Sequence, residues 1–291
     1  KKDGLSDTVL ARLKLKPKQT DLKDWRAMVS KTKHASKEIK IAVVGKYFKT
    51  GEFVLSDVYI SVIESLRHAA TKLGYQAKLE WLDAGDYEGG NQARNLAKLA
   101  RYDAILVPGG FGERGAEGKI NVIRYAREKK IPYFGLCYGM QLAVIEYARH
   151  VAGLKSANTT EIDAGTKYPV IDVMVEQKKN LSSHNLGGTM RLGAYPAWLK
   201  KGTLAEKIYQ SQKISERHRH RYEVNQDYIA ELEKAGLIFS GTSPDGKLME
   251  MIELPTKKHP FFLATQFHPE FKSTPLHPHP LFVAFLKAAL K

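Results

Sequence analysis

A strand meets a helix within residues 132–141, Pro-Tyr-Phe-Gly-Leu-Cys-Tyr-Gly-Met-Gln. The apolar run 132–136 predicts a buried strand. The apolar residues that follow recur at helical spacing and predict a helix over 138–149. One residue, Cys137, stands at the turn between the two elements.

The same alternation of strand and helix extends upstream of this stretch. The predicted strands are 39–45, 77–82, 103–107 and 132–136, and the predicted helices are 62–73, 91–101, 116–129 and 138–149. Beyond residue 168 the pattern changes to short strands and turns, with helices near 226–235 and 280–290. Strands that alternate with helices predict an α/β fold with a doubly wound, mostly parallel sheet flanked by helices.

The composition is that of a globular protein, with 43% hydrophobic and 26% charged residues in a chain of 291. One cysteine cannot form an intrachain disulfide, and this favours the cytosol. No apolar run reaches the length of a membrane span, and the N-terminus does not resemble a signal peptide. We therefore expect a cytoplasmic protein with no membrane partner. The chain starts with Lys1 rather than Met, which indicates a piece of a longer protein.

The net charge of +15 is unevenly distributed. Residues 1–37 contain eleven Lys or Arg and four Asp or Glu, a net +7, and residues 38–291 carry the other +8. No nucleic-acid-binding motif accompanies this charge, so we expect no nucleic-acid partner. Two short helices, predicted over 3–15 and 21–33, suit a basic helical linker over 1–37 that precedes one domain over 38–291.

Cys137 is a candidate nucleophile. A strand-to-helix turn of this kind is the nucleophile elbow of α/β hydrolytic enzymes, and Gly135 and Gly139 leave room for it. The amides and dipole at the start of a helix stabilise a thiolate, and the amide of Tyr138 is placed to donate to an oxyanion. A buried structural cysteine at a strand end is the alternative.

His268 and Glu270 are candidates for a general base and the group that orients it. Pro269 favours an extended backbone at His268, and alternate residues of an extended segment project on the same side. We therefore expect the Glu270 carboxylate to hold the imidazole, as in a catalytic triad. His-Pro-Glu also occurs by chance in surface loops, so the tripeptide alone does not decide its role.

A glycine-rich loop, Pro-Gly-Gly-Phe-Gly at 108–112, follows the predicted strand 103–107. Glycines let backbone amides approach a ligand closely, so this loop could supply a second oxyanion donor. A tight turn or a phosphate loop is the alternative. The sequence contains no Gly-x-x-x-x-Gly-Lys-Ser/Thr motif of a P-loop.

With these pieces placed, the chain resembles the glutaminase domains of CTP synthases, which are class I glutamine amidotransferases, over about residues 3–291. The segments that carry the resemblance are 107–115 (Val-Pro-Gly-Gly-Phe-Gly-Glu-Arg-Gly), 187–193 (Gly-Gly-Thr-Met-Arg-Leu-Gly), 216–225 (Glu-Arg-His-Arg-His-Arg-Tyr-Glu-Val-Asn) and 266–275 (Gln-Phe-His-Pro-Glu-Phe-Lys-Ser-Thr-Pro). Cys-x-Gly-x-Gln and His-Pro-Glu are shared with the wider class. Residues 1–37 resemble the helical connector to an amidoligase domain.

The resemblance implies hydrolysis of L-glutamine to glutamate and ammonia, with Cys137 as nucleophile, His268 as base and Glu270 as its orienter. The residues implied to hold glutamine are Gly110, Tyr138, Gly139, Met140, Gln141, Glu161 and Arg221. Gly110 and Tyr138 would also form the oxyanion hole. On charge alone, Arg221 suits the α-carboxylate through a bidentate pair, and Glu161 suits the α-ammonium.

The resemblance also implies partners. Ammonia would pass to an amidoligase domain of the same polypeptide, which uses ATP and Mg²⁺ to convert UTP to CTP. GTP would act as an allosteric activator, and the loop with Phe111 and Arg114 lies where that coupling is expected. The resemblance implies no cofactor in this domain. We also expect no metal, because His218 and His220 lack further ligands at the spacing of a zinc site.

Two residues beside Cys137 depart from the usual pattern of the family. Leu136 and Tyr138 stand where the family usually has Ile or Val and then Leu. The oxyanion donor is a backbone amide, so Tyr138 should leave the chemistry intact and alter only the pocket wall or the response to GTP.

The alternative functions are another cysteine hydrolase of this fold, such as a γ-glutamyl hydrolase or a peptidase, and a non-catalytic scaffold domain.

Overall fold

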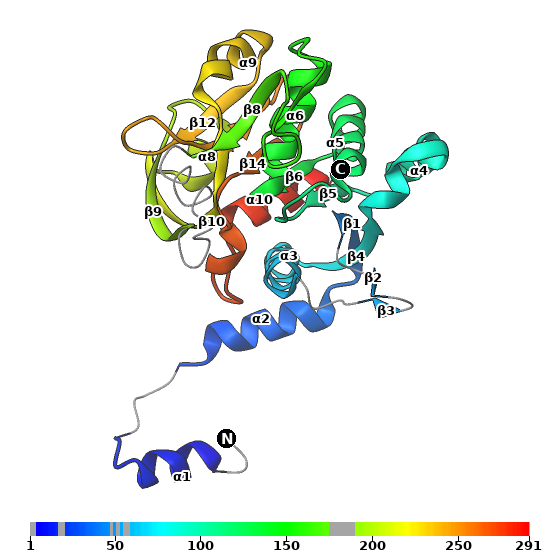
Figure 1. Ribbon diagram of the computed structural model, residues 1–291. Helices are drawn as coiled ribbons and strands as arrows, with labels where there is room; N and C mark the ends of the chain where they lie inside the picture. Colours follow the sequence, from blue (N-terminus) through cyan, green and yellow to red (C-terminus); the bar gives the residue numbers. More distant parts are fainter. Residues whose placement is uncertain are drawn as a thin grey trace.

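A nine-stranded sheet forms the centre of the molecule (Figure 1). The computed structural model describes residues 4–16, 21–46, 49–50, 53–54, 59–174 and 190–290. In spatial order, the strands are β10 (Lys213–His220), β9 (Arg191–Leu199), β12 (Ile238–Thr242), β13 (Met249–Glu253), β14 (Phe262–Thr265), β6 (Tyr133–Leu136), β5 (Ala104–Val107), β1 (Lys37–Gly45) and β4 (Tyr75–Asp83). The strands from β14 to β4 are parallel, and those from β14 to β10 pair antiparallel.

Helices cover both faces of the sheet. The long ones are α3 (Ile60–Leu73), α5 (Ala116–Lys129), α6 (Tyr138–His150) and α10 (Pro280–Ala289). The shorter elements are α4 (Gln92–Ala97), α8 (Leu204–Tyr209) and α9 (Ile229–Ala235), the small sheet of β11 (Tyr222–Val224), β8 (Tyr168–Val173) and β7 (Ala157–Thr159), and the pair β2 (Lys49–Thr50) and β3 (Phe53–Val54). The 3₁₀ turns are η1 (Ala84–Tyr87), η2 (Gly89–Asn91), η3 (Lys98–Arg101), η4 (Gln226–Tyr228) and η5 (Pro269–Lys272).

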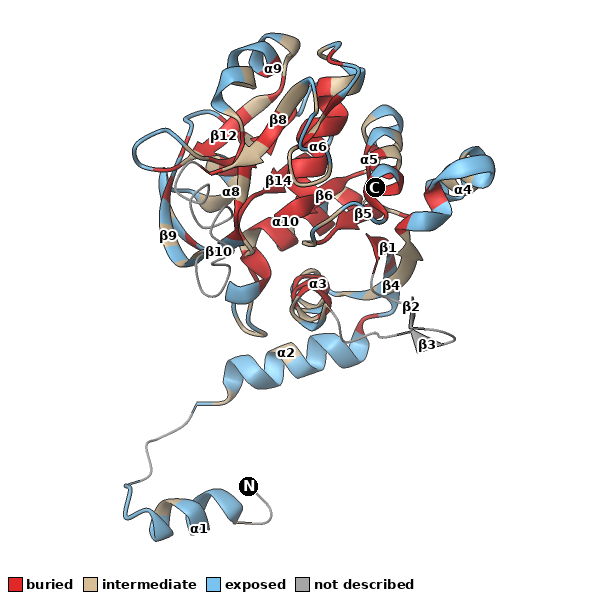
Figure 2. Ribbon diagram, viewed as in Figure 1, coloured by how far each residue is buried: buried red, intermediate tan, exposed pale blue. Residues whose placement is uncertain are grey.

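The two faces are built by alternation along the central strands. In β5, Ile105 and Val107 contribute to a core shared with α5 and α6, whereas Ala104 and Leu106 contribute to a core shared with α3 and α10. Successive side chains of a strand point to opposite faces, so an unbroken apolar run is required when both faces are covered. The fully buried interior of Figure 2 follows from this pattern.

The predicted α/β fold is confirmed, and its details differ in three places. The predicted helix 91–101 begins as α4 and ends as the 3₁₀ turn η3, and the short helix α8 was not predicted. The sheet also continues for four antiparallel strands beyond β14. Those strands are short or carry alternating polar residues, so their periodicity did not reveal how they join the parallel part.

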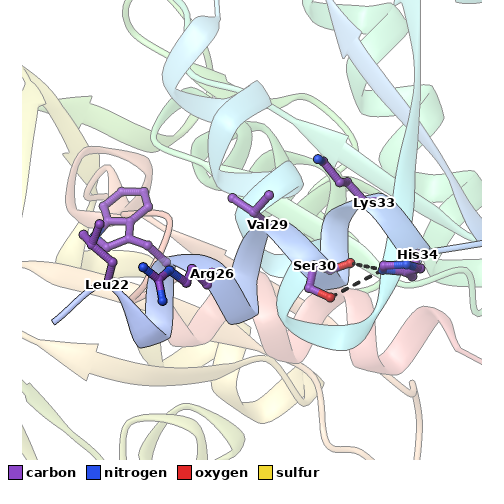
Figure 3. A pocket seen from close by; sticks show the side chains of 7 residues that line it. Leu22, Arg26, Val29, Ser30, Lys33 and His34 are labelled. Atoms are coloured by element: carbon purple, nitrogen blue, oxygen red, sulfur yellow. Dashed lines mark hydrogen bonds between the residues drawn. The ribbon is translucent and has the colours of Figure 1, made fainter. Parts of the chain in front are cut away.

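The N-terminal segment forms α1 (Leu5–Arg12) and α2 (Lys23–His34), close to the predicted helices. Neither helix has a buried residue, as Figure 2 shows. The side chain of Asp21 accepts a hydrogen bond from the Lys23 amide at 2.8 Å, although the capping position itself is Leu22. Leu22, at the N-cap of α2, and side chains of α2 such as the exposed Val29 line a pocket (Figure 3). The domain division at residue 37 stays a prediction.

Across the part of the chain that the structure describes, every helix is too short or too polar to span a bilayer.

The core around β6 gives the first prediction. Phe134 is fully buried and its ring lies 5.2 Å from that of Phe282 and 5.5 Å from that of Phe285. We expect Phe134→Ala to reduce the free energy of unfolding by about 3–5 kcal/mol, because it leaves a cavity between β6 and α10. Urea denaturation measures this, with the exposed Leu192→Ala as control. Equal stability of the two variants would contradict the packing described.

Candidate active site

The candidate site lies where three neighbouring parallel strands, β5, β6 and β14, end at the same edge of the sheet. In the register, Val107 of β5 pairs with Gly135 of β6, and Leu136 of β6 pairs with Thr265 of β14. The carboxyl ends of adjacent parallel strands lie together, which is where open α/β sheets bind their ligands. The glycine-rich loop, Cys137 and the segment with His268 follow these three ends.

Cys137 lies in a strained turn. Its φ of 49° and ψ of −101° are unusual for a residue with a side chain, and such strain is typical of functional sites. The amides of Met140 and Gln141 donate to the Cys137 carbonyl at 2.9 and 3.1 Å, which starts α6. The turn needs glycine at 139, since a Cβ there would lie 2.3 Å from the Val107 carbonyl oxygen. The tight strand-to-helix turn expected from the sequence is therefore present.

The Cys137 thiol is buried among polar groups. The residue is 6% exposed, and its sulfur lies 3.8 Å from the Arg219 carbonyl oxygen, within reach of an S–H donor. The Gln266 amide nitrogen donates to the sulfur at 3.5 Å. Gln266 was not singled out from the sequence. Its position two residues before His268, at the end of a strand beside β6, was the available signal.

His268 is held by Glu270, as expected, but by a different route. The Nδ1 atom of His268 and the Oε1 atom of Glu270 lie 2.7 Å apart. The prediction that these residues share one side of an extended segment is wrong, because residues 269–272 form η5 with His268 as its N-cap. Pro269 begins this tight turn, which brings the carboxylate back to the imidazole. The ring of Phe271 also stacks on His268, with centroids 5.3 Å apart.

The imidazole of His268 also interacts with Cys137. Burial lowers the pKa of His268, but the negative charges of Glu270 and Cys137, and hydrogen bonds to both, raise it well above its usual value. A raised pKa means that the protonated imidazole is favoured, and a nearby imidazolium stabilises a thiolate. The sequence-predicted triad residues therefore meet in one place.

The glycine-rich loop closes over this pair. A Cβ on Gly109 would lie 3.0 Å from Cε1 of His268, so only glycine allows the loop to approach the imidazole this closely. The Tyr138 hydroxyl donates to the Gly112 carbonyl at 2.6 Å. The Lys46 ammonium donates to the Phe111 carbonyl. The loop is thus tied to the start of α6 and to the end of β1.

Glu161 and Arg221 both lie near enough to Tyr222 for their charges to act on its hydroxyl. The Gly112 amide donates to the Glu161 carboxylate at 3.0 Å. Burial raises the pKa of Tyr222, the nearby negative charge of Glu161 raises it further, and the positive charge of Arg221 lowers it. These two charges of opposite sign are therefore both near Tyr222, and Glu161 also contacts the loop that adjoins Cys137. This arrangement is consistent with recognition of the two charged groups of an amino acid.

The remaining predicted residues have separate surroundings. Gln141 is buried, and its amide nitrogen donates to the Tyr222 carbonyl at 3.0 Å and to Gln266 Oε1 at 3.2 Å. Gln141 thereby orients Gln266, the residue that donates to the cysteine sulfur. Phe111 is 66% exposed, with the Lys46 ammonium 5.0 Å from its ring centroid, and Arg114 is exposed as well.

A polar cluster near His268 is formed by the partly buried Arg191 and four buried residues, His218, His220, Glu223 and Glu250. Arg191 forms an ion pair with Glu250 at 2.8 Å. Burial, followed by the charge of Arg191, lowers the pKa of His218 to about 2 and that of His220 to about 3, so both imidazoles are neutral. Among the described residues, no group of three or more His, Cys, Asp or Glu side chains has the arrangement of a metal site. The cluster supports β10 beside the site.

The family of the chain follows from comparison with known proteins. Residues 54–288 match the family model described as glutamine amidotransferase class-I. The chain belongs to the class I glutamine amidotransferase family.

Relatives place the chain more narrowly. It is 50% identical over 290 residues to the CTP synthase of Bacillus licheniformis and 51% identical over 289 residues to that of Pyrococcus furiosus. These matches include 100% and 99% of this chain but 52% and 51% of the two relatives, so the chain spans about half their length. The glutaminase domain of Trypanosoma brucei CTPS with bound acivicin has a TM-score of 0.79 and 39% identity, over 86% of this chain and 93% of that one. Within its family, the chain groups with the glutaminase domains of CTP synthases.

The contact between His268 and Glu270 gives the second prediction. We expect Glu270→Gln to lower the pKa of His268, because the variant loses the carboxylate charge that favours the imidazolium. The folded state of the wild type favours protonated His268. The preference for protonated His268 therefore contributes fully to the free energy of unfolding below the pKa of the unfolded chain, about 6.5. This contribution is lost as the pH rises through the higher pKa of the folded protein. NMR titration of the His268 ring measures the change, and an unaltered pKa in the variant would contradict the described pair.

Proposed function

We propose that the chain hydrolyses L-glutamine to glutamate and ammonia through a glutamyl thioester on Cys137. The Cys137 thiolate attacks the side-chain amide carbonyl, and the oxyanion accepts hydrogen bonds from the backbone amides of Gly110 and Tyr138. Protonated His268 gives its proton to the amide nitrogen, the C–N bond breaks and ammonia leaves.

The second half of the reaction restores the starting state. Neutral His268 takes a proton from water while the water oxygen attacks the thioester carbonyl. The C–S bond then breaks, glutamate departs, and the thiolate and imidazolium are formed again. Throughout, Glu270 holds the ring through Nδ1, so that Nε2 is the nitrogen that exchanges protons.

The observation that carries this proposal is the convergence of Cys137, His268 and Glu270 at the ends of β6 and β14. A paired imidazole with a raised pKa stabilises the thiolate and is also the acid that the leaving ammonia needs. The bound acivicin of the Trypanosoma brucei glutaminase domain supports a site for glutamine-like ligands in this fold.

Glutamine recognition rests on Arg221 and Glu161. We assign the α-carboxylate to Arg221, because a guanidinium makes a bidentate pair with a carboxylate. Glu161, anchored by the Gly112 amide, is assigned to the α-ammonium. Gly139 and Met140 follow Tyr138 in the first turn of α6 and contribute to the wall beside the nucleophile.

The relatives support a wider role for the full-length protein. The ammonia would be used by an amidoligase domain of the same polypeptide to convert UTP to CTP with ATP and Mg²⁺, in the cytoplasm. GTP would act as an allosteric activator through the loop that carries Phe111 and Arg114. The exposed ring of Phe111 and the contact of Lys46 with this loop favour that assignment, because a ligand that moves the loop would also move the Gly110 donor.

Loss of the nucleophile gives the third prediction. We expect Cys137→Ala to abolish ammonia release from glutamine, at least a 10⁴-fold loss, because no thioester forms. Ammonia is measured with and without GTP, and circular dichroism confirms that the variant is folded. Turnover that persists in the folded variant would exclude Cys137 as the nucleophile. Peptide hydrolysis that exceeds glutamine hydrolysis by the wild type would contradict the substrate assignment.

The carboxylate clamp gives the fourth prediction. Arg221→Ala should raise KM for glutamine by about 10- to 100-fold, because the variant loses a hydrogen bond between two charged groups. It should leave kcat within a few-fold of the wild type. Arg221→Lys, which retains the charge but loses the planar fork, should give an intermediate KM. Steady-state kinetics measure both variants. A lower kcat at unchanged KM would assign Arg221 to another role.

A further inference from the structure

Lys119 is a buried cationic side chain that the proposed reaction does not use. It lies in the first turns of α5 and is 0% exposed. Among the described residues, its ammonium has no hydrogen-bond partner. The charged group is therefore held inside the protein without the partners that usually accompany a buried ammonium.

Stability does not explain this position. Burial, together with the charge of Lys46, lowers the pKa of Lys119 to about 7, and Asp83 opposes this only in part. The start of α5 adds the positive end of a helix dipole, which is also unfavourable for a cation. An unpaired buried charge destabilises a fold, and features of this kind occur at functional sites.

Lys119 lies beside the two residues that are assigned to the proposed oxyanion hole. Its ammonium would lie 3.5 Å from a Cβ placed on Gly110, and it lies 5.2 Å from the ring centroid of Tyr138. These are the two residues whose backbone amides are assigned as oxyanion donors. The Gly110 amide makes no hydrogen bond to another described residue, as expected of a donor that is kept for a ligand.

The two lysines beside this loop are engaged differently. Lys46 already donates to the Phe111 carbonyl and lies over the Phe111 ring. Lys119 contacts Tyr138 through a cation–π interaction, and the Tyr138 hydroxyl bonds to the Gly112 carbonyl. Lys119 thus lies beside the Tyr138 side chain and the Gly110 position of the loop.

We propose that Lys119 is a positioning residue of the oxyanion hole, whose buried positive charge stabilises the tetrahedral intermediate through the Gly110 loop and Tyr138 without touching the substrate. This inference rests on the proposed glutaminase function. A cation fixed in a site of low dielectric stabilises a negative charge that develops several ångströms away. The growing oxyanion in turn favours the protonated form of Lys119, so the stabilisation is strongest in the transition state.

Lys119→Met tests the inference, because methionine retains the length and apolar stem of lysine without the charge. The exposed Lys129→Met, on the same helix, is the matched control. At pH 6.5 we expect Lys119→Met to lower kcat for glutamine by about 10- to 100-fold with KM nearly unchanged. Its Tm should equal or exceed that of the wild type, because an unpaired buried charge has been removed.

A second measurement separates the oxyanion hole from the nucleophile. Iodoacetamide alkylates a thiolate by direct displacement and forms no oxyanion, so Cys137 of Lys119→Met should react at the wild-type rate. A kcat within twofold of the wild type would overturn the inference. So would a parallel loss of alkylation, or a lowered Tm with a raised KM, since these indicate a role in packing. Wild-type protein that releases no ammonia from glutamine would instead overturn the proposed function, and this inference with it.

Discussion

The Cys137 amide donates to the Thr265 carbonyl at 2.6 Å, and the candidate site depends on the strand register that this hydrogen bond continues. It fixes the end of β6 against the end of β14, although the two strands are far apart in the sequence. A shift by one residue would turn the side chains that follow each strand to the opposite face. The nucleophile and the imidazole meet because two parallel strands end level with one another.

Buried polar groups surround the contact between Cys137 and His268. Gln141 orients Gln266, which donates to the cysteine sulfur. Behind the imidazole, the ion pair of Arg191 and Glu250 lies beside two neutral histidines. Removal of one partner from such a network leaves a buried polar group without compensation, which is costly. The His268 amide donates to the Arg217 carbonyl at 2.8 Å, so β10, which carries these two histidines, is held against the segment with the imidazole.

Much of this could be predicted from the sequence, for reasons visible in particular residues. Both faces of β5 and β6 are covered, so their apolar runs are unbroken and the parallel half of the sheet was evident. The Cys137 turn was evident because a strand pattern changes to a helix pattern within a few residues. His268 and Glu270 were identified as a pair, but the 3₁₀ turn that joins them was not. Proline at a first helical position and proline in an extended segment look alike in a sequence.

What escaped prediction depends on long-range packing. The only sequence signal for Gln266 is its position two residues before His268, and Lys119 has no local signal because it is one lysine in a helix rich in charge. Gln266 reaches the cysteine sulfur only because its strand pairs with β6, and Lys119 lies near the site only because the loop at Gly110 packs beside it.

The most direct test of the account is a covalent one. The chain is incubated with a glutamine-like electrophile, 6-diazo-5-oxo-norleucine, and the modified residue is located by mass spectrometry of its peptides. We predict a single adduct on Cys137, formed much more slowly in His268→Ala, because the imidazolium no longer stabilises the thiolate. An adduct on another residue, or labelling of Cys137 at an equal rate without the imidazole, would contradict the claim that these two side chains act together.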